Sequence, residues 1–225
     1  MAGRLLAIGD IHGCLAQFDA LIGAVGLTPS DHLILLGDYV DRGPESAGVL
    51  RRIVRLSGTH RLSCIQGNHE EMMMQAREGG QRFREWLLNG GDATMASYGG
   101  TRGTIKDVPA EHWRFLETKL VDYVETESHI FVHASAYPDM NMDEQPDFML
   151  RWERCDNIQA HQSGKVIVCG HTPQRDGSPL NMGHAICIDT HACGHGVLTC
   201  LEAKSGKVWQ ADENGRVERS HISDY

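Results

Sequence analysis

Short apolar runs alternate with amphipathic segments over the first 80 residues of the chain. Residues 5–8, 33–36 and 62–65 are largely apolar runs typical of buried strands, interrupted only by Ser63. Between them, apolar residues recur at helical spacing, first from Leu15 to Val25 and then from Val49 to Val54. This order predicts alternating strands and helices, which favours a mostly parallel sheet with function at the carboxyl ends of its strands.

Three residues mark where the predicted helices begin or end. Gly26 follows the first helix, at a position where a left-handed C-terminal cap favours glycine. Pro44 is expected to begin the second helix, because proline is tolerated in a first turn. The third helix is expected to begin at Glu70.

The second half of the chain changes from helical to strand-rich near residue 120. Residues 81–119 are polar and helical in pattern, with aromatic anchors and a helix start at Pro109. Strand-like runs follow at 121–124, 129–132, 166–169, 185–188, 197–201 and 208–211, and the segments 204–207 and 213–216 have the composition of hairpin turns. No repeat or linker interrupts this pattern. We therefore predict one domain over residues 1–225, an α/β fold of two packed sheets with helices outside.

Charge and hydropathy exclude several function classes. The formal net charge of −9 gives no electrostatic footprint for nucleic acid or for an anionic membrane surface. No apolar run approaches the length of a membrane span. The start Met1-Ala2-Gly3-Arg4 leads directly into a strand and does not have the pattern of a signal peptide.

The seven cysteines are scattered along the chain and form no C-x-x-C pair. Within strand-like runs, cysteine behaves as a small hydrophobic residue. We therefore expect reduced thiols and a cytoplasmic location.

Metal-ligand side chains follow the first three predicted strands, each set between glycines. The segments are Gly9-Asp10-Ile11-His12-Gly13, Gly37-Asp38-Tyr39-Val40-Asp41-Arg42-Gly43 and Gly67-Asn68-His69-Glu70. Two later strands end in Phe131-Val132-His133-Ala134 and Gly170-His171-Thr172-Pro173. We expect these strand ends to share one rim, where oxygen ligands mixed with imidazole suit Mn, Fe or Zn ions.

The five strand ends together carry enough ligands for two ions: Asp10, His12, Asp38, Asn68, His133 and His171. A carboxylate can bridge two cations with its two oxygens, so Asp38 is the predicted bridge. Two ions about 3.5–4 Å apart can hold a water between them and present hydroxide in line with a phosphorus atom. The pattern therefore predicts phosphate-ester hydrolysis.

The leaving oxygen needs a proton, and the sequence offers a donor. His69 lies beside Asn68 and is expected near the ions without binding them, with Asp41 orienting it and raising its pKa. Arg42 provides a bidentate fork for phosphoryl oxygens. Arg151 and Arg154 are rival candidates for a second phosphate clamp.

The ordered motifs resemble the signature of the calcineurin-like metallophosphoesterases, and most closely the compact bacterial and bacteriophage phosphoprotein phosphatases. The resemblance implies the calcineurin-like fold, two mixed sheets flanked by helices, with the metal site at the C-terminal ends of the strands. It implies that the first ion takes Asp10, His12 and Asp38, and the second takes Asp38, Asn68, His133 and His171. Two divalent ions are expected, with Mn²⁺ favoured and Fe or Zn as alternatives.

The same resemblance implies roles for the remaining residues. His69 with Asp41 would be the acid pair, and Arg42 would grip phosphate. The family's W-x-R setting favours Arg154 as the second clamp, which leaves Arg151 in a structural ion pair. Residues 188–194 lack the tyrosine-cysteine pair of the larger eukaryotic enzymes, so regulatory subunits are not indicated.

Three functions fit this resemblance to different degrees. The favoured one is a protein phosphatase acting on phosphoserine and phosphothreonine, with phosphotyrosine peptides or small phosphoesters as further substrates. The alternative is a symmetrical diadenosine tetraphosphate hydrolase, whose third motif usually ends in Asp where this chain has Glu70. The third is a catalytically silent metal-binding module. It is disfavoured because the sequence has a residue for each metal ligand and for the catalytic acid.

His184, His191 and His195 lie in a glycine-rich stretch near the end and are candidates for another metal site. No ligand spacing stands out among them. We therefore interpret them as loop residues near the rim.

Overall fold

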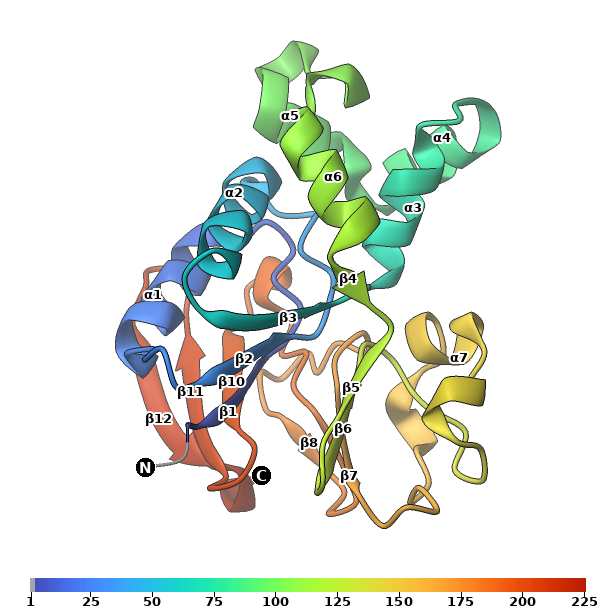
Figure 1. The fold of residues 1–225 in the computed structure, drawn as a ribbon. Helices are drawn as coiled ribbons and strands as arrows, with labels where there is room; N and C mark the ends of the chain where they lie inside the picture. The colour runs from blue at the N-terminus through green and yellow to red at the C-terminus, as the bar shows by residue number, and fades with distance from the viewer. Residues whose placement is uncertain (1–2) are drawn as a thin grey trace.

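Two β-sheets pack face to face with helices on their outer sides (Figure 1). This is a computed structural model that describes residues 3–225, so Met1 and Ala2, and the expectation about the start of the chain, lie outside the described residues. The larger sheet has the spatial order β12 (Val217–His221), β11 (Lys207–Ala211), β10 (Leu198–Glu202), β1 (Leu5–Ile8), β2 (His32–Leu35), β3 (Arg61–Ile65) and β4 (Leu120–Val121). The smaller has the order β5 (Tyr123–Glu125), β6 (His129–Val132), β7 (Val166–Cys169), β9 (Ala185–Cys187) and β8 (Leu180–Asn181).

Both sheets are mixed: the parallel strands form one side of the larger sheet, with β4 at its edge, and the centre of the smaller sheet. Strands β1 to β4 run parallel to their sequence neighbours, whereas β10, β11 and β12 pair in antiparallel fashion through hairpins. In the smaller sheet β6, β7 and β9 are parallel, and β5 and β8 are antiparallel edges. The predicted α/β fold with two packed sheets is confirmed.

The helices form an outer layer and an upper extension. They are α1 (Leu15–Val25), α2 (Ser46–Ser57), α3 (Asn68–Ala76), α4 (Gly80–Trp86), α5 (Asp92–Gly99), α6 (Ala110–Thr118) and α7 (Asp147–Arg151). A π-type turn, η1 (Leu87–Gly91), joins α4 to α5, and the 3₁₀ turns are η2 (Gly100–Arg102), η3 (Ile105–Asp107), η4 (Met142–Glu144), η5 (Cys155–Asn157), η6 (Ala192–Gly194) and η7 (Ile222–Asp224). Figure 1 shows α3 to α6 standing above the sheets. Within residues 3–225, none of the helices is both long and apolar enough to cross a bilayer.

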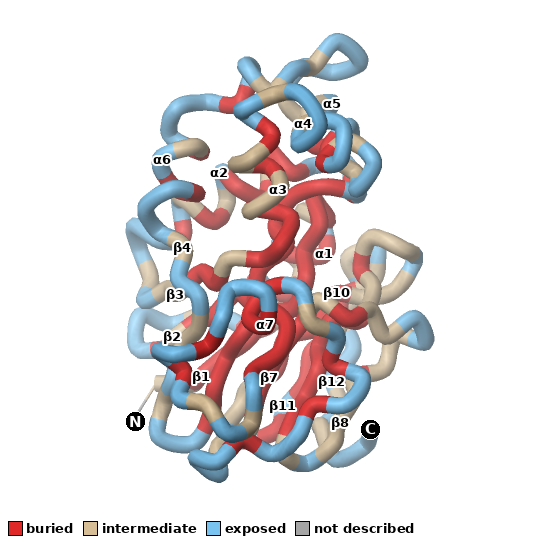
Figure 2. The backbone as a smooth tube through the Cα atoms, turned by 90° about the vertical axis from the view of Figure 1, so that its right-hand side faces the viewer, coloured by how far each residue is buried: buried red, intermediate tan, exposed pale blue. Residues whose placement is uncertain are grey.

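Alternation along the strands explains why the sheets can be covered on both sides. In β1, Leu5 and Ala7 belong to the core between the sheets, where they join Phe131 and Val168. Leu6 and Ile8 belong instead to the core under the helices. Because successive side chains of a strand point to opposite faces, one apolar run supplies both cores. Figure 2 shows these strands as buried and much of α4 to α6 as exposed.

Several element boundaries differ from the sequence prediction. Helix α2 begins at Ser46 and not at Pro44, because the backbone of Glu45 is non-helical and its N–H donates to the Gly13 carbonyl at 3.0 Å. Helix α3 begins at Asn68, two residues before the predicted start. The predicted strand 121–124 divides at Asp122, where the chain crosses from one sheet to the other.

Other local predictions are confirmed. Gly26 ends α1 in the left-handed conformation, with φ 59°, and its N–H donates to the Ile22 carbonyl. Both predicted hairpin turns connect antiparallel strands, β10 to β11 and β11 to β12. Strands β8 and β12 were not predicted, because β8 has only two residues and β12 is largely polar.

Candidate metal centre and active site

The six predicted metal ligands follow strands of both sheets and meet where the sheets join. Asp10, His12, Asp38 and Asn68 come from the ends of β1, β2 and β3, whereas His133 and His171 come from β6 and β7. Asp38 lies at the centre of the group. Its two carboxylate oxygens are 3.4 Å from His12 Nε2 and 3.4 Å from His133 Nε2, respectively. Asp10 accepts the backbone N–H of His171 at 3.1 Å.

The hydrogen bonds of the imidazole rings suggest a cation at this centre. His133 Nδ1–H donates to the Leu36 carbonyl at 2.8 Å, so its Nε2 presents a lone pair. That lone pair faces the Asn68 Oδ1 atom at 3.0 Å. His171 donates through Nε2 to the Trp152 carbonyl, and its Nδ1 faces the same Asn68 oxygen at 3.1 Å. These nitrogen and oxygen lone pairs converge with no proton between them. Such an arrangement fits a divalent metal ion, which the lone pairs would bind.

Burial keeps the ligand imidazoles neutral, as metal binding requires. It lowers the pKa of His133 to about 4, and it lowers the pKa values of His12 and His171 as well. Burial alone would raise the pKa of Asp38, but the surrounding histidines, His133 foremost, hold it well below its usual range. The centre therefore offers neutral nitrogens around one ionised carboxylate.

The loops that carry these ligands adopt backbone conformations that are unusual for their residue types. His12, Asp38 and His171 have φ values of 42°, 50° and 64°, in the left-handed region. Such conformations cost energy and persist where the surrounding structure enforces them, often at functional sites. Glycines make room beside them: a Cβ atom on Gly67 or on Gly170 would lie 2.1 Å from a carboxylate oxygen of Asp38 or Asp10, respectively.

Glu70 holds the second motif loop and does not face the ligand cluster. Its carboxylate accepts the backbone N–H groups of Gly67, Asp38, Tyr39 and Val40 at 2.7 to 3.3 Å. The carboxylate thus joins the loop after β2 to the loop after β3.

His69 and Asp41 form the hydrogen-bonded pair that the sequence predicts. His69 Nδ1 is 2.7 Å from Asp41 Oδ2, and both side chains are almost fully buried. Burial alone would lower the pKa of His69, but the carboxylates of Asp38 and Asp41 outweigh it and the net shift is upward. His69 Nε2 lies 3.9 Å from Asp38 Oδ2, and His12, Asp38 and His69 form one of the groups compact enough to hold a metal ion. That His69 lies near the ions without binding them stays a prediction.

Two residues of the helical extension support this pair, and the sequence analysis did not identify their role. Trp86 Nε1 donates to both oxygens of Asp41 at 2.9 and 3.0 Å, and Thr94 Oγ1 donates to Asp41 Oδ1 at 2.7 Å. Trp86 is one of the aromatic residues predicted to anchor the helical segment 81–119. Its side chain is buried, as expected of an anchor, and its Nε1–H also donates a hydrogen bond to Asp41. In the sequence, Trp86 and Thr94 lie on either side of Gly90-Gly91, and this is the pattern that could have indicated their role.

The arginines occupy different environments. Arg42 Nη1 donates to His12 Nε2 at 2.9 Å, which places its guanidinium beside the metal ligands. Arg151 is buried and pairs with Asp122 at 2.5 Å and with Asp147 at 2.9 Å. Arg154 lies beyond the end of α7, is exposed, and pairs with Asp156 at 2.6 Å. Which of these last two grips phosphate stays a prediction.

A sixth strand end also carries an acid near the centre. Asp189 follows β9 and is buried, and burial raises its pKa to about 7. Its charge acts on Asp10, whose pKa burial and Asp189 raise together. Asp189 directly follows the apolar run 185–188, so the sequence is consistent with its place at the same rim. It lacks the neighbouring glycines that drew attention to the first motifs.

His184, His191 and His195 do not form a cluster. Among residues 3–225, three groups of side chains are compact enough to hold a metal ion, and none includes these histidines. His184 Nε2 donates to the Ile158 carbonyl, whereas the side chain of His195 is 93% exposed and lies near Glu213.

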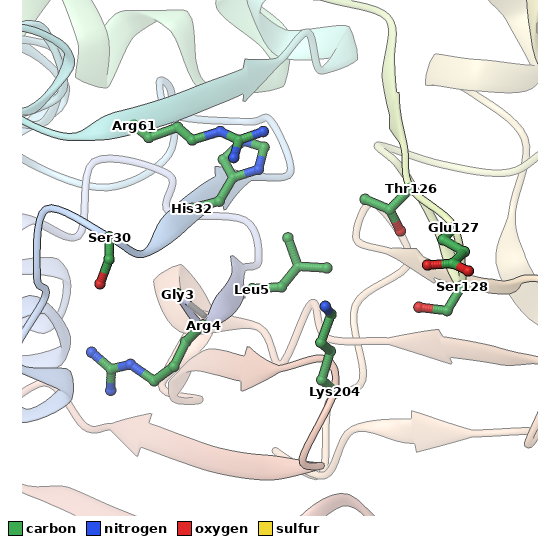
Figure 3. A pocket seen from close by; sticks show the side chains of 10 residues that line it. All are labelled: Gly3, Arg4, Leu5, Ser30, His32, Arg61, Thr126, Glu127, Ser128 and Lys204. Carbon is green, nitrogen blue, oxygen red and sulfur yellow. The ribbon is translucent and has the colours of Figure 1, made fainter. Parts of the chain in front are cut away.

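A separate cavity of about 320 Å³ opens at the opposite rim of the sheets. Figure 3 shows His32 and Arg61 on one wall, Thr126, Glu127 and Ser128 on the other, and Lys204 between them. These residues lie at the amino-terminal ends of the parallel strands, whereas the ligands follow the carboxyl ends. The cavity is therefore separate from the metal centre.

Comparisons with solved structures agree on the fold. A putative diadenosine tetraphosphatase matches with a TM-score of 0.68 at 21% identity, covering 98% of this chain and 94% of that chain. A cold-active protein tyrosine phosphatase also matches with a TM-score of 0.68, at 17% identity, covering 99% of this chain and 80% of that chain. At these identities the likeness concerns the fold alone.

Sequence comparisons agree on the family. A serine/threonine-protein phosphatase 1 from Salmonella typhimurium is 31% identical over 204 residues, covering 85% of this chain and 88% of the relative. A symmetrical bis(5'-nucleosyl)-tetraphosphatase from an Acidovorax species is 43% identical over 79 residues, covering 35% of this chain and 27% of the relative. The sequence profile of calcineurin-like phosphoesterases matches residues 3–195. With its fold and its ordered ligand motifs, the chain belongs to the calcineurin-like phosphoesterase family.

Proposed function

We propose that this phosphoesterase is a protein phosphatase that hydrolyses phosphoserine and phosphothreonine. The observation that carries this choice is coverage: the likeness to a serine/threonine-protein phosphatase extends over 85% of this chain and 88% of the relative. The higher identity to a tetraphosphatase spans only 27% of that relative. In sequence, the chain thus matches one class along its length and the other in part, whereas the fold is shared by both.

The proposed metal sites use the six ligands, with Asp38 shared. Asp10 and His12 would complete the first site, and Asn68, His133 and His171 the second. Mn²⁺ is the proposed ion, because mixed oxygen and imidazole ligands suit it. Two such ions would lower the pKa of a bound water and act as Lewis acids toward the phosphoryl oxygens.

The chain's own side chains would then position phosphate and move the proton. Arg42, beside His12, would hold phosphoryl oxygens through its planar fork. His69, raised in pKa and held through Nδ1 by Asp41, would donate its Nε2 proton to the leaving serine or threonine oxygen. Trp86 and Thr94 keep Asp41 in place while the charge on His69 changes. Arg154 is the proposed second clamp.

We propose the phosphorylated protein as the binding partner, without nucleic acid, membrane or regulatory subunits. The seven free thiols support a cytoplasmic setting.

The test is a substrate comparison with Mn²⁺-reconstituted protein. Phosphoserine, phosphothreonine and phosphotyrosine peptides are offered beside diadenosine tetraphosphate, and kcat/KM is measured for each. The proposal expects the highest kcat/KM on the phosphoserine and phosphothreonine peptides. A higher value for diadenosine tetraphosphate would overturn it in favour of the tetraphosphatase. His69→Asn serves as the control for contaminating activity.

A further inference from the structure

Three cysteines that are distant in sequence meet in the core of the smaller sheet. Cys155 begins η5, Cys169 ends β7 and Cys187 ends β9. Their Sγ atoms all lie within 4.8 Å of one another. In the sequence, the strand-like runs around Cys169 and Cys187 favour small hydrophobic residues, and the spacings of 14 and 18 residues match no thiolate motif, so nothing in the pattern predicts this meeting.

The strand register explains how two of the three thiols come together. Strands β7 and β9 are parallel neighbours, and Cys169 and Cys187 are direct partners across them. Their side chains therefore point to the same face of the sheet. Cys155 reaches that face from η5, whose start is held by the bond from the Cys155 N–H to Thr172 Oγ1 at 2.9 Å.

The site formed by these thiols is dry and separate from the catalytic ligands. All three side chains have no exposed surface, and they lie among Leu150, Ile158 and other apolar residues. Cys187 Sγ is close to the Gly170 and Thr172 carbonyls, at 3.3 and 3.5 Å. The cluster therefore lies beneath the turn that carries His171.

We propose that Cys155, Cys169 and Cys187 form a binding site for a soft metal ion, with copper(I) as the occupant. Sulfur ligands select soft ions, copper(I) among them. An ion at the centre of three sulfurs with bonds of about 2.3 Å would set them about 4.0 Å apart, which is compatible with the observed limit of 4.8 Å.

The number of donors favours copper(I) over zinc. Structural zinc almost always takes four ligands. Among the His, Cys, Asp and Glu side chains of residues 3–225, the donors grouped at this point are three sulfurs, and the side chains packed around them are largely apolar. Copper(I) is satisfied by three sulfur ligands. Each thiol proton would leave to solvent as its sulfur binds the ion.

The bound ion would connect the strand ends to the segment after α7. Cys155 lies three residues beyond Trp152, whose carbonyl orients His171, and Cys169 lies two residues before His171. An ion across the three sulfurs would therefore stabilise the support of the catalytic ligand without contacting substrate.

The test uses the folded, reduced, chelator-treated protein under anaerobic conditions. Copper(I) is titrated in against the competing chelator bicinchoninate, and the retained copper is counted. The proposal expects one equivalent, an X-ray absorption spectrum with sulfur neighbours only, and a higher melting temperature. Retention of no copper against the chelator would overturn it, and so would a spectrum with nitrogen or oxygen neighbours, which would place the ion on the histidines.

Single variants identify the ligands. Cys155→Ala, Cys169→Ala and Cys187→Ala should each lower copper(I) affinity by more than the roughly 10–100-fold that loss of a ligand's supporting partner costs. Cys200→Ala removes an equally buried thiol on the other sheet and should leave the affinity unchanged. Equal affinities in all four variants would contradict the assignment. If a cluster variant does not fold, the absorption spectrum of the unsubstituted protein still decides between sulfur and histidine ligation.

Discussion

His69 is the residue whose chemistry is most specific to the proposed reaction. Its Nδ1 atom is bound to Asp41 at 2.7 Å, while Nε2 faces the metal cluster. We expect His69→Asn to lower kcat by roughly 10²–10⁴-fold, the range for a lost general acid. Metal content should stay nearly unchanged, because His69 is not one of the six predicted ligands and all six remain.

The leaving group provides the control for this prediction. A nitrophenolate needs little protonation, so the defect of His69→Asn should be smaller for nitrophenyl phosphate than for a phosphoserine peptide. Steady-state kinetics on both substrates and metal analysis of the variant measure the two effects. Loss of the metals from His69→Asn would show that the residue is a ligand.

Asp31 provides a residue-scale test of stability against pH. Its carboxylate accepts the Arg4 side chain at 2.6 Å and is 3% exposed, and the Arg4 guanidinium foremost holds the pKa of Asp31 below its usual range. A lowered carboxyl pKa stabilises the fold above the unfolded pKa of about 3.9, and this stability is lost as the pH falls through the folded value.

We therefore expect Asp31→Asn to lower the free energy of unfolding at pH 7 by about 1–3 kcal/mol, the range for hydrogen bonds to charged groups. The difference from the unsubstituted protein should shrink as the pH falls below about 4. Urea unfolding at several pH values measures it. A difference that does not change with pH would mean that the ion pair contributes nothing.

At the scale of elements, the turn between α4 and α5 connects the helical extension to the second motif. The Gly90 carbonyl accepts the Arg42 N–H at 3.1 Å, and Trp86 and Thr94 on either side of the turn bind Asp41. We expect Trp86→Phe to lower kcat roughly tenfold, because a hydrogen bond to a charged group contributes about 1.5–3 kcal/mol.

A purely structural role for Trp86 would give a different result. It would lower the melting temperature and leave the dependence of kcat on the leaving group unchanged. The positioning role predicts that Trp86→Phe, like His69→Asn, is more impaired on phosphopeptides than on nitrophenyl phosphate. Ring size is nearly kept, so the extension should stay folded.

Helix α7 and the segment after it distinguish the two candidate clamps. Arg151 ends α7 and is bound by Asp122 and Asp147, whereas Arg154 lies beyond the helix and is exposed. We expect Arg151→Ala to lower the free energy of unfolding by about 1–3 kcal/mol with little effect on kcat. Arg154→Ala should raise KM and lower kcat for phosphopeptides, because phosphate is gripped in ground and transition states alike. A kinetic defect confined to Arg151→Ala would reverse the assignment.

At the scale of the whole molecule, the predicted metal centre lies between the two sheets. Asp10, His12, Asp38 and Asn68 belong to one sheet, and His133 and His171 to the other. Bound ions would therefore stabilise the packing of the sheets as well as supply chemistry. A ligand at 100 times its Kd adds about 2.7 kcal/mol, which for a domain of this size raises Tm by about 5–11 °C.

We expect chelation to lower Tm by that amount, and Mn²⁺ to restore it with two ions per chain. Asp38→Asn should weaken both sites, because Asp38 is shared, while asparagine tolerates its left-handed backbone. Thermal unfolding measures Tm, and calorimetric titration with Mn²⁺ measures the number of ions and the affinity of the sites. A full-occupancy structure with one ion, or with Asp38 facing away, would contradict this prediction.

The sequence by itself determined the parts of this protein that depend on local pattern. Apolar runs predicted the strands, because a central parallel strand is buried on both faces, and Gly26 marked a helix end that needs a positive φ. Ligands at five strand ends, four of them beside a glycine, predicted the metal centre, because parallel strands bring their carboxyl ends to one rim. The pair of His69 and Asp41 was predictable for the same reason.

The tertiary structure decided what depends on contacts between distant segments. The division of the predicted strand at Asp122, the bonds from Trp86 and Thr94 to Asp41, and the burial of Asp189 each depend on how separate elements pack. The meeting of Cys155, Cys169 and Cys187 is of the same kind. Periodicity places a side chain on a face of its own element, but which faces meet depends on the packing of the entire chain.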